Sequence, residues 1–135
     1  MDNTSRLLFY GELNNGLDYS YQKDWAVSFK ARYKHIPFFD VDNHSDQSML
    51  TYAKQLIEES KPIVLVLSLN DAEELGIIKT IVSILVKKKG EMFFVKVGNH
   101  PMLDKMLKLV KKEMLFELES EDQIIPIIEK ILNHG

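Results

Sequence analysis

The sequence contains no cysteine, few residues that break regular structure (6 glycines and 4 prolines), and no long apolar run. The absence of cysteine excludes disulfides, thiolate nucleophiles and thiolate metal sites, and it is compatible with a reducing compartment. A membrane-spanning helix needs roughly 20 consecutive apolar residues, and no run approaches that length. The N-terminal residues also lack the basic stretch and apolar segment of a signal peptide. We therefore expect a cytoplasmic protein that is not inserted in a membrane.

An excess of positive charge is lacking as well. The chain has 17 Lys+Arg and 20 Asp+Glu, which gives a net charge of -3. Without a basic field there is nothing to attract a polyanion, so nucleic acid is not an expected partner. A length of 135 residues with 45% hydrophobic content is typical of one folded domain. We expect residues 1–135 to form a single domain.

Strand-like apolar runs alternate with helical stripes along the whole chain. Runs bounded by Gly, Pro or polar residues predict strands at 7–10, 36–41, 62–68, 92–97 and 115–118. Apolar residues at three- and four-residue steps predict helices at 18–33, 49–59, 102–110 and 124–132, with Trp25 on the buried face of the first. Another helix is expected between a cap at Asn70 or Asp71 and the basic segment 87–90, and Ser45 or Asp46 is expected to cap the helix at 49–59.

This alternation predicts an α/β fold, because strands that alternate with helices form right-handed crossovers and a parallel sheet. We expect a three-layer, flavodoxin-like sandwich whose five strands have the order 2-1-3-4-5. In such sheets, ligands bind at the carboxyl ends of the strands, near the point where the strand order reverses. The loops at 11–18, 68–74 and 98–101 are therefore the places where a site is expected.

Polar residues in these loops define a candidate small-molecule site. An enzyme or nucleotide-binding protein would use Glu12 as a base and Ser68 as a polar contact, and its full set of candidate ligand-binding residues is Gly11, Glu12, Asn14, Ser68, Asn70 and His100. A phosphate-binding P-loop is not expected, because Leu17 and Asp18 stand where lysine and a hydroxyl residue are required. His100 also fits a plain turn shaped by its Gly and Pro neighbours.

No metal site or cofactor is predicted. The four histidines lie in separate loops or at the terminus without paired ligand spacing. No G-x-G-x-x-G segment follows a strand, so a dinucleotide cofactor has no motif. A phosphoreceiver domain is also excluded, because the expected aspartate at the end of the third strand is Ser68 and a lysine after the fifth strand is missing.

The first half of the chain resembles a TIR domain. The resemblance rests on 9–12 (FYGE), 37–40 (PFFD), 56–60 (LIEES), and the strand 63–68 followed by Asn70. TIR domains have an F-x-G-E-like turn after the first strand and an I-E-E-S segment leading to a strand that ends L-S-x-N. The resemblance implies a flavodoxin-like fold and a role in signalling through protein interaction or self-association.

The resemblance stops at the catalytic glutamate. TIR domains that cleave NAD carry this residue in the helix after the third strand, where the present chain has Gly76, Ile77 and Thr80. Glu73 and Glu74 lie nearby, one to two turns early, and with Glu12 they are the weak catalytic candidates. We therefore expect a non-catalytic interaction domain whose contacts come from the loops after the first and second strands, with 42–47 and the end of the second strand as a candidate surface. The alternative is an NAD-cleaving or nucleoside-processing enzyme.

Overall fold

The computed structural model describes residues 5–13, 24–70, 74–88 and 92–133. Within these ranges, five strands alternate with five helices, as the sequence predicts, and two short 3-10 helices are also present. In chain order these are β1 (Ser5–Glu12), α1 (Asp24–Arg32), β2 (Phe38–Asp42), α2 (Ser48–Glu59), β3 (Ser60–Ser68), α3 (Ile77–Lys87), β4 (Met92–Val97), α4 (Pro101–Leu107), η1 (Lys112–Met114), β5 (Leu115–Leu118), η2 (Glu121–Gln123) and α5 (Ile124–Asn133).

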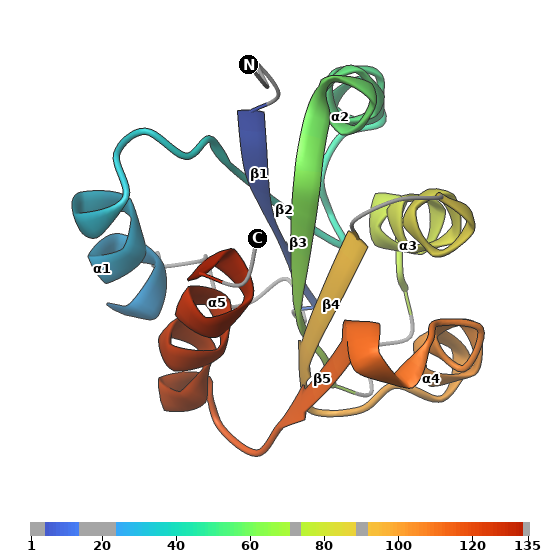
Figure 1. Cartoon of the computed structure of the whole chain (residues 1–135). Helices are drawn as coiled ribbons and strands as arrows, with labels where there is room; N and C mark the ends of the chain where they lie inside the picture. The colour runs from blue at the N-terminus through green and yellow to red at the C-terminus, as the bar shows by residue number, and fades with distance from the viewer. Residues whose placement is uncertain (1–4, 14–23, 71–73, 89–91, 134–135) are drawn as a thin grey trace.

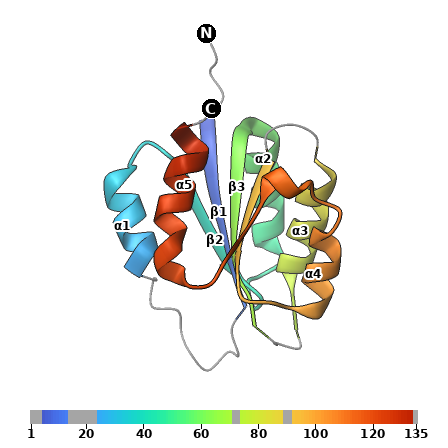
Figure 2. The same ribbon diagram turned by 60° about the horizontal axis from the view of Figure 1, so that its bottom comes forward.

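The strands form one parallel sheet in the order β2-β1-β3-β4-β5, which confirms the predicted flavodoxin-like topology. The order reverses at β1, which lies between β2 and β3. All strands run toward the lower end of Figure 1, and Figure 2 turns that end toward the viewer. The carboxyl ends of the strands and the loops that follow them therefore share this edge, which we call the carboxyl edge.

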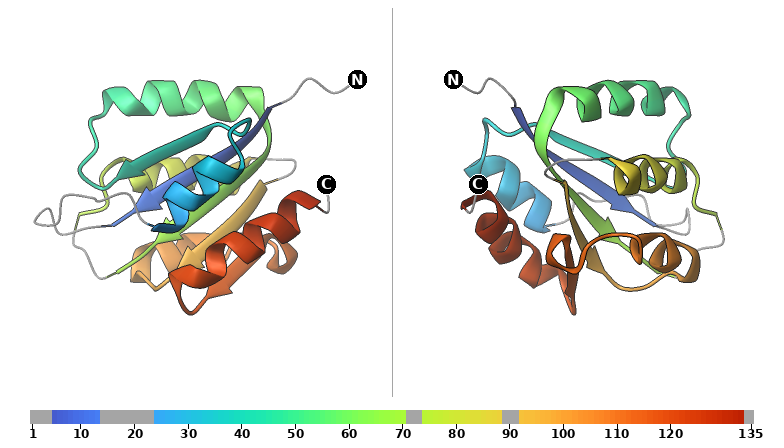
Figure 3. Two further views of the ribbon diagram at one scale, coloured as in Figure 1. Left: turned by 90° about the vertical axis from the view of Figure 1, so that its left-hand side faces the viewer. Right: turned by 45° about the vertical axis from the view of Figure 1, so that its right-hand side comes forward.

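The helices cover both faces of the sheet. Helices α1 and α5 lie side by side on one face, and α2, α3 and α4 lie on the other (Figures 1 and 3). Side chains alternate along β1, so that Leu7 and Phe9 pack toward α2–α4 whereas Leu8 and Tyr10 pack toward α1 and α5. Strand β3 is buried on both faces, which explains its unbroken apolar run. None of the helices in the described ranges is long and apolar enough to cross a membrane.

Strand β1 is longer than its apolar run. Its pairing with β2 and β3 continues to Glu12, so Gly11 and Glu12 belong to the strand rather than to the loop that the sequence predicts. A Cβ atom at Gly11 would lie 3.1 Å from the Leu67 Cδ2 atom and 3.7 Å from Ile78 Cγ1. The glycine therefore allows α3 to pack closely against the sheet.

The helix starts differ in how they are capped. The cap residue of α2 is Gln47, which makes no side-chain cap hydrogen bond, so the predicted cap at Ser45 or Asp46 is wrong. The Asp46 carboxylate, one residue earlier, still accepts a hydrogen bond from the Ser48 N–H at 2.8 Å. The predicted cap of α3 at Asn70 is wrong, because α3 begins at Ile77 and its cap residue is Gly76, which makes no side-chain hydrogen bond. Asp71 lies outside the described residues. The buried side chain of His100 caps α4, because its Nδ1 accepts from Met102 N at 3.2 Å.

Candidate functional site

Three polar residues lie in one row at the carboxyl edge, and two of them, Glu12 and Ser68, are predicted site residues. Glu12 at the end of β1 stands opposite Asp42 at the end of β2 and opposite Ser68 at the end of β3. Side chains at paired positions of parallel strands lie on the same face of the sheet. This row therefore lies on the face covered by α1 and α5, because Tyr10, two residues before Glu12, packs there.

The other predicted ligand residues have structural contacts. The Asn70 Nδ2 donates to the Leu13 carbonyl at 2.8 Å and so joins the segments that follow β3 and β1. Gly11 lies against α3, on the opposite face from the row. His100 caps α4, which also packs on that opposite face. The structure thus brings Glu12 and Ser68 together but holds Gly11, Asn70 and His100 in other contacts.

Of the two weak catalytic candidates in the β3–α3 segment, only Glu74 lies among the described residues. Asn14 and Glu73 lie outside the described residues. Glu74 has an exposed side chain, and its carbonyl accepts a hydrogen bond from Asn43 Nδ2 at 2.7 Å. Of the positions where an NAD-cleaving TIR domain carries its glutamate, Gly76 packs on the backbone of Asn43 and Ile77 is fully buried.

The loop between β2 and α2 is held firmly at the carboxyl edge. Buried Asn43 joins it to the Glu74 carbonyl, and Gly76 approaches so closely that a Cβ there would lie 2.2 Å from the Asn43 oxygen. Within the loop, the Asp42 carboxylate accepts from His44 N at 2.8 Å, and Ser45 Oγ accepts from Asp42 N at 2.9 Å. The exposed side chains of the loop therefore project from an ordered backbone.

Two buried polar atoms lie beside the row on the α1 and α5 face. The Tyr10 hydroxyl and the Trp25 Nε1 have no hydrogen-bond partner among the described residues, although both side chains are at least nine-tenths buried. The rings meet edge to face, with centroids 5.0 Å apart. Buried polar groups of tyrosine and tryptophan normally find a partner, because leaving one unpaired costs about 1–3 kcal/mol. These two groups therefore need an explanation.

The electrostatic environment keeps the Tyr10 hydroxyl protonated. Burial raises the pKa of Tyr10 well above its ordinary value, and the nearby Glu12 carboxylate raises it further, with a smaller contribution from Glu121. Ser68 lies close enough to oppose this effect, but neither Ser68 nor Glu12 reaches the hydroxyl with normal hydrogen-bond geometry. A neutral phenol is a hydrogen-bond donor, so Tyr10 and Trp25 each offer a proton at this place.

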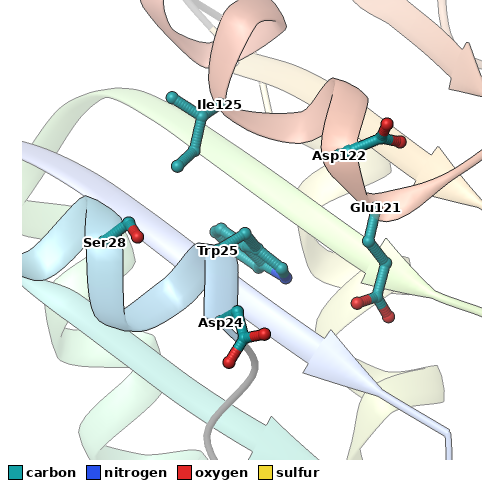
Figure 4. A pocket seen from close by; sticks show the side chains of 6 residues that line it. All are labelled: Asp24, Trp25, Ser28, Glu121, Asp122 and Ile125. Carbon is teal, nitrogen blue, oxygen red and sulfur yellow. The ribbon is translucent and has the colours of Figure 1, made fainter.

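A cavity of about 390 Å³, which the Trp25 side chain lines in part, opens between the start of α1 and the β5–α5 connection. Figure 4 shows its lining, which comprises Asp24, Trp25, Ser28, Glu121, Asp122 and Ile125. The indole nitrogen of Trp25 lies on the side of the ring that faces Glu121 (Figure 4). Trp25 and Ile125 supply an apolar wall, and three carboxylates supply negative charge. This volume is within the usual range of small-molecule sites, roughly 300–1,000 Å³.

The carboxylates of the cavity are not arranged for a metal ion. In the ranges that the structure describes, no group of three or more His, Cys, Asp or Glu side chains could hold one. The Asp122 carboxylate instead accepts a hydrogen bond from the Ser120 hydroxyl.

A second hollow, of about 310 Å³, lies at the opposite edge of the sheet, where β4 and β5 begin. Its polar lining is basic and includes Lys87, Lys88 and Lys111. The polar linings of the two hollows thus differ in charge.

Sequence reasoning placed Trp25 in the core and assigned no role to Tyr10, Asp24 or the acidic residues 121–122. The alternation of side chains along β1 could have placed Tyr10 on the same face as Glu12. The proximity of Glu121 could not have been found in this way, because it depends on the packing of α5 beside α1.

Comparisons of the chain with protein-family models, with curated proteins and with solved structures find no match. The similarity to TIR domains therefore stays a prediction from the sequence.

Proposed function

We propose that this chain is a non-catalytic, TIR-like signalling and protein-interaction domain that associates through the loop 42–47. The ordered attachment of this loop to the start of α3 is the observation that carries the proposal. A loop already held in one conformation loses less entropy on binding than a flexible one. Asn43 and Gly76 provide this rigidity through contacts with backbone atoms, while His44, Asp46 and Gln47 remain exposed.

The lack of an α3 carboxylate supports a non-catalytic role. At the three positions that correspond to the TIR glutamate, the side chains are absent (Gly76), apolar and buried (Ile77) or a hydroxyl (Thr80). The close packing of Gly76 on Asn43 leaves no space for any side chain there. The same packing that would obstruct an active site holds the interaction loop in place.

Charge complementarity favours self-association between copies of the chain. The carboxyl edge carries acidic side chains, including exposed Asp46 and Asp122, whereas the opposite edge carries Lys87, Lys88 and Lys111. Opposite charges on facing surfaces steer association and fix its orientation. A head-to-tail contact between these two edges would bring the acidic end of one copy to the basic end of the next.

Sedimentation velocity over a range of protein and salt concentrations tests this proposal. We expect association that strengthens with protein concentration and weakens as salt is added, because exposed charges are screened over about 10 Å at 0.1 M salt. Gln47→Lys and Lys88→Glu should each weaken association, and the double variant should recover part of it. Gln55→Lys and Lys79→Glu, at exposed positions within α2 and α3, should have no effect. A chain that stays monomeric under all conditions would contradict self-association.

A further inference from the structure

Strand β2 is the last strand at one side of the sheet, and no described strand pairs with its outer side. The Leu8 N–H donates to the Pro37 carbonyl at 3.0 Å, so the backbone of Pro37 faces β1. Because the N–H and C=O groups of successive residues point to opposite sides of a strand, Phe39 also faces β1, whereas Phe38 and Asp40 direct these groups outward. Such an open edge is a template for pairing with another chain.

The two helices beside this edge leave apolar side chains exposed. Tyr52 of α2 is 55% exposed, and its ring centroid lies 5.4 Å from that of Phe39. Val27 of α1 is 50% exposed and lies one turn before Lys30, on the same side of the helix. The Lys30 Nζ lies 4.6 Å from the centre of the Phe38 ring, so this side of α1 is next to β2. Apolar side chains therefore flank the β2 edge on both faces of the sheet.

The backbone groups beyond Phe38 and Asp40 are already in use. At the carboxyl end, the Asp42 N–H donates to Ser45 Oγ at 2.9 Å, and the Asp42 carbonyl accepts from Ser45 N at 3.2 Å. At the other end, the Ile36 N–H donates to the Tyr33 carbonyl at 3.1 Å. A second strand can therefore pair fully only with the two residues in between.

This restriction selects one antiparallel register for a second copy of the chain. If the pairing is centred on Phe39, Phe38 of each copy stands opposite Asp40 of the other, and each pair exchanges both of its backbone hydrogen bonds. A pairing centred on Asp40 would instead place two carboxylates directly opposite each other, which is destabilising. It would also set Phe38 against Asp42, whose backbone groups are bonded within the loop.

The register centred on Phe39 is also complementary in charge. Asp40 is exposed and lies two residues after Phe38, so both side chains are on the face of the sheet that α1 covers. Opposite Phe38 of the second copy, the Asp40 carboxylate would lie beside the Lys30 ammonium that covers that ring. On the other face, the two Phe39 rings would meet across the symmetry axis, each beside its own Tyr52.

We propose that two copies of this chain join their β2 edges as a symmetric antiparallel pair, which makes one continuous sheet across a dimer. Ion pairs between Lys30 and Asp40 fix the register on the α1 face, and Phe39 and Tyr52 of both copies are buried together on the α2 face. This contact goes beyond the head-to-tail association proposed above and does not depend on it. A symmetric contact closes at two copies, whereas a head-to-tail contact adds further copies unless a ring closes.

Sedimentation velocity of the full chain with Lys88→Glu tests this contact, because Lys88 belongs to the head-to-tail surface and not to β2. We expect a monomer–dimer equilibrium without larger species. In this background, Asp40→Lys and Lys30→Glu should each raise the dissociation constant roughly tenfold or more, because each places like charges together twice in the dimer. Lys54→Glu and Glu58→Lys, at exposed positions of α2, are the matched controls and should leave it unchanged.

A mixture of the two weakened variants gives the sharpest result. In a mixed dimer, the new lysine at position 40 of one copy faces the new glutamate at position 30 of the other, and the second pair is the natural one. The mixture should therefore dimerise about as well as the Lys88→Glu chain, although neither variant does so alone. Amide hydrogen exchange locates the contact, because the Phe38 and Asp40 amides should be protected in the dimer and exposed in the monomer.

Three results would overturn the proposal. These are a mixture of Asp40→Lys and Lys30→Glu that stays as weakly associated as its components, a dimer in which the Phe38 and Asp40 amides stay unprotected, and a Lys88→Glu chain that is monomeric at every concentration. If the natural chain associates while the Lys88→Glu chain does not, the head-to-tail contact stands and the β2 contact is refuted. The reverse loss, in Asp40→Lys but not in Lys88→Glu, supports the β2 contact alone.

Discussion

Replacement of Gly76 by alanine tests how the loop after β2 is attached to the start of α3. Gly76 has φ +54° and ψ -142°, a backbone conformation that residues with a side chain rarely adopt. A Cβ at this position would lie 2.2 Å from the Asn43 oxygen and 2.9 Å from its carbonyl carbon. Because both are backbone atoms, the contact can be relieved only if the loop or the start of α3 moves.

The expected destabilisation is about 3 kcal/mol. A residue forced into such a backbone region costs about 1–3 kcal/mol. Movement of the loop also breaks the hydrogen bond of 2.7 Å between Asn43 Nδ2 and the Glu74 carbonyl, which contributes about 1 kcal/mol more. The sum is a large part of the total stability of an ordinary domain, about 5–15 kcal/mol. For a chain of this size it corresponds to a fall of about 10 °C in Tm.

Urea unfolding followed by circular dichroism measures this effect, with Gly11→Ala as the matched control. The φ of Gly11 is not positive, and its added Cβ would meet only side-chain atoms, at 3.1 Å or more. We expect Gly11→Ala to cost about 1 kcal/mol, because side chains can adjust to mild overpacking. Equal unfolding free energies for the two variants would refute the idea that the Gly76 backbone contact holds the loop.

Two further predictions concern α4 and the strand before it. His100→Ala should lower the free energy of unfolding by about 1 kcal/mol, because α4 loses its cap. His100→Asn should retain most of the stability, since asparagine is a good helix cap. Chemical denaturation measures the free energy of unfolding of both variants. Asp104→Ala should cost about 3 kcal/mol, because it removes the carboxylate 2.8 Å from the Lys96 ammonium, whose side chain is 8% exposed. Lys96→Met replaces the buried charge with an apolar side chain, so it should lower the free energy of unfolding much less than Asp104→Ala does. Equal losses of unfolding free energy in the two variants would contradict the idea that an unpaired buried charge causes the destabilisation.

The topology could be predicted because the strands carry strong local signals. The run from Ile63 to Leu67 is buried on both faces of the sheet, and such a run is typical of a central parallel strand. The alternation with helices then limits the possible connections to right-handed crossovers, which the observed order satisfies. The ends of the elements were predicted less well. Strand β1 extends to Glu12 because its neighbours on both sides continue to pair with it, and a polar residue gives no local sign of that pairing.

The start of α3 shows why a capping signal can mislead. Asn70 has the side chain of a good helix cap, but its amide is used to join two loops through the Leu13 carbonyl. Leu75 is buried although it lies two residues before the helix begins. A local sequence pattern can identify apolar residues that will be buried, but tertiary contacts decide which of them belong to a helix.

The candidate site was only partly predictable for the same reason. Glu12 and Ser68 follow from the rule that parallel strands end at one edge. The burial of Trp25 was predicted correctly. That its buried N–H has no hydrogen-bond acceptor among the described residues can be seen only when the surrounding packing is known. Two of the three acidic residues of the cavity, Glu121 and Asp122, come from η2, which is distant from α1 in sequence and adjacent to it in space.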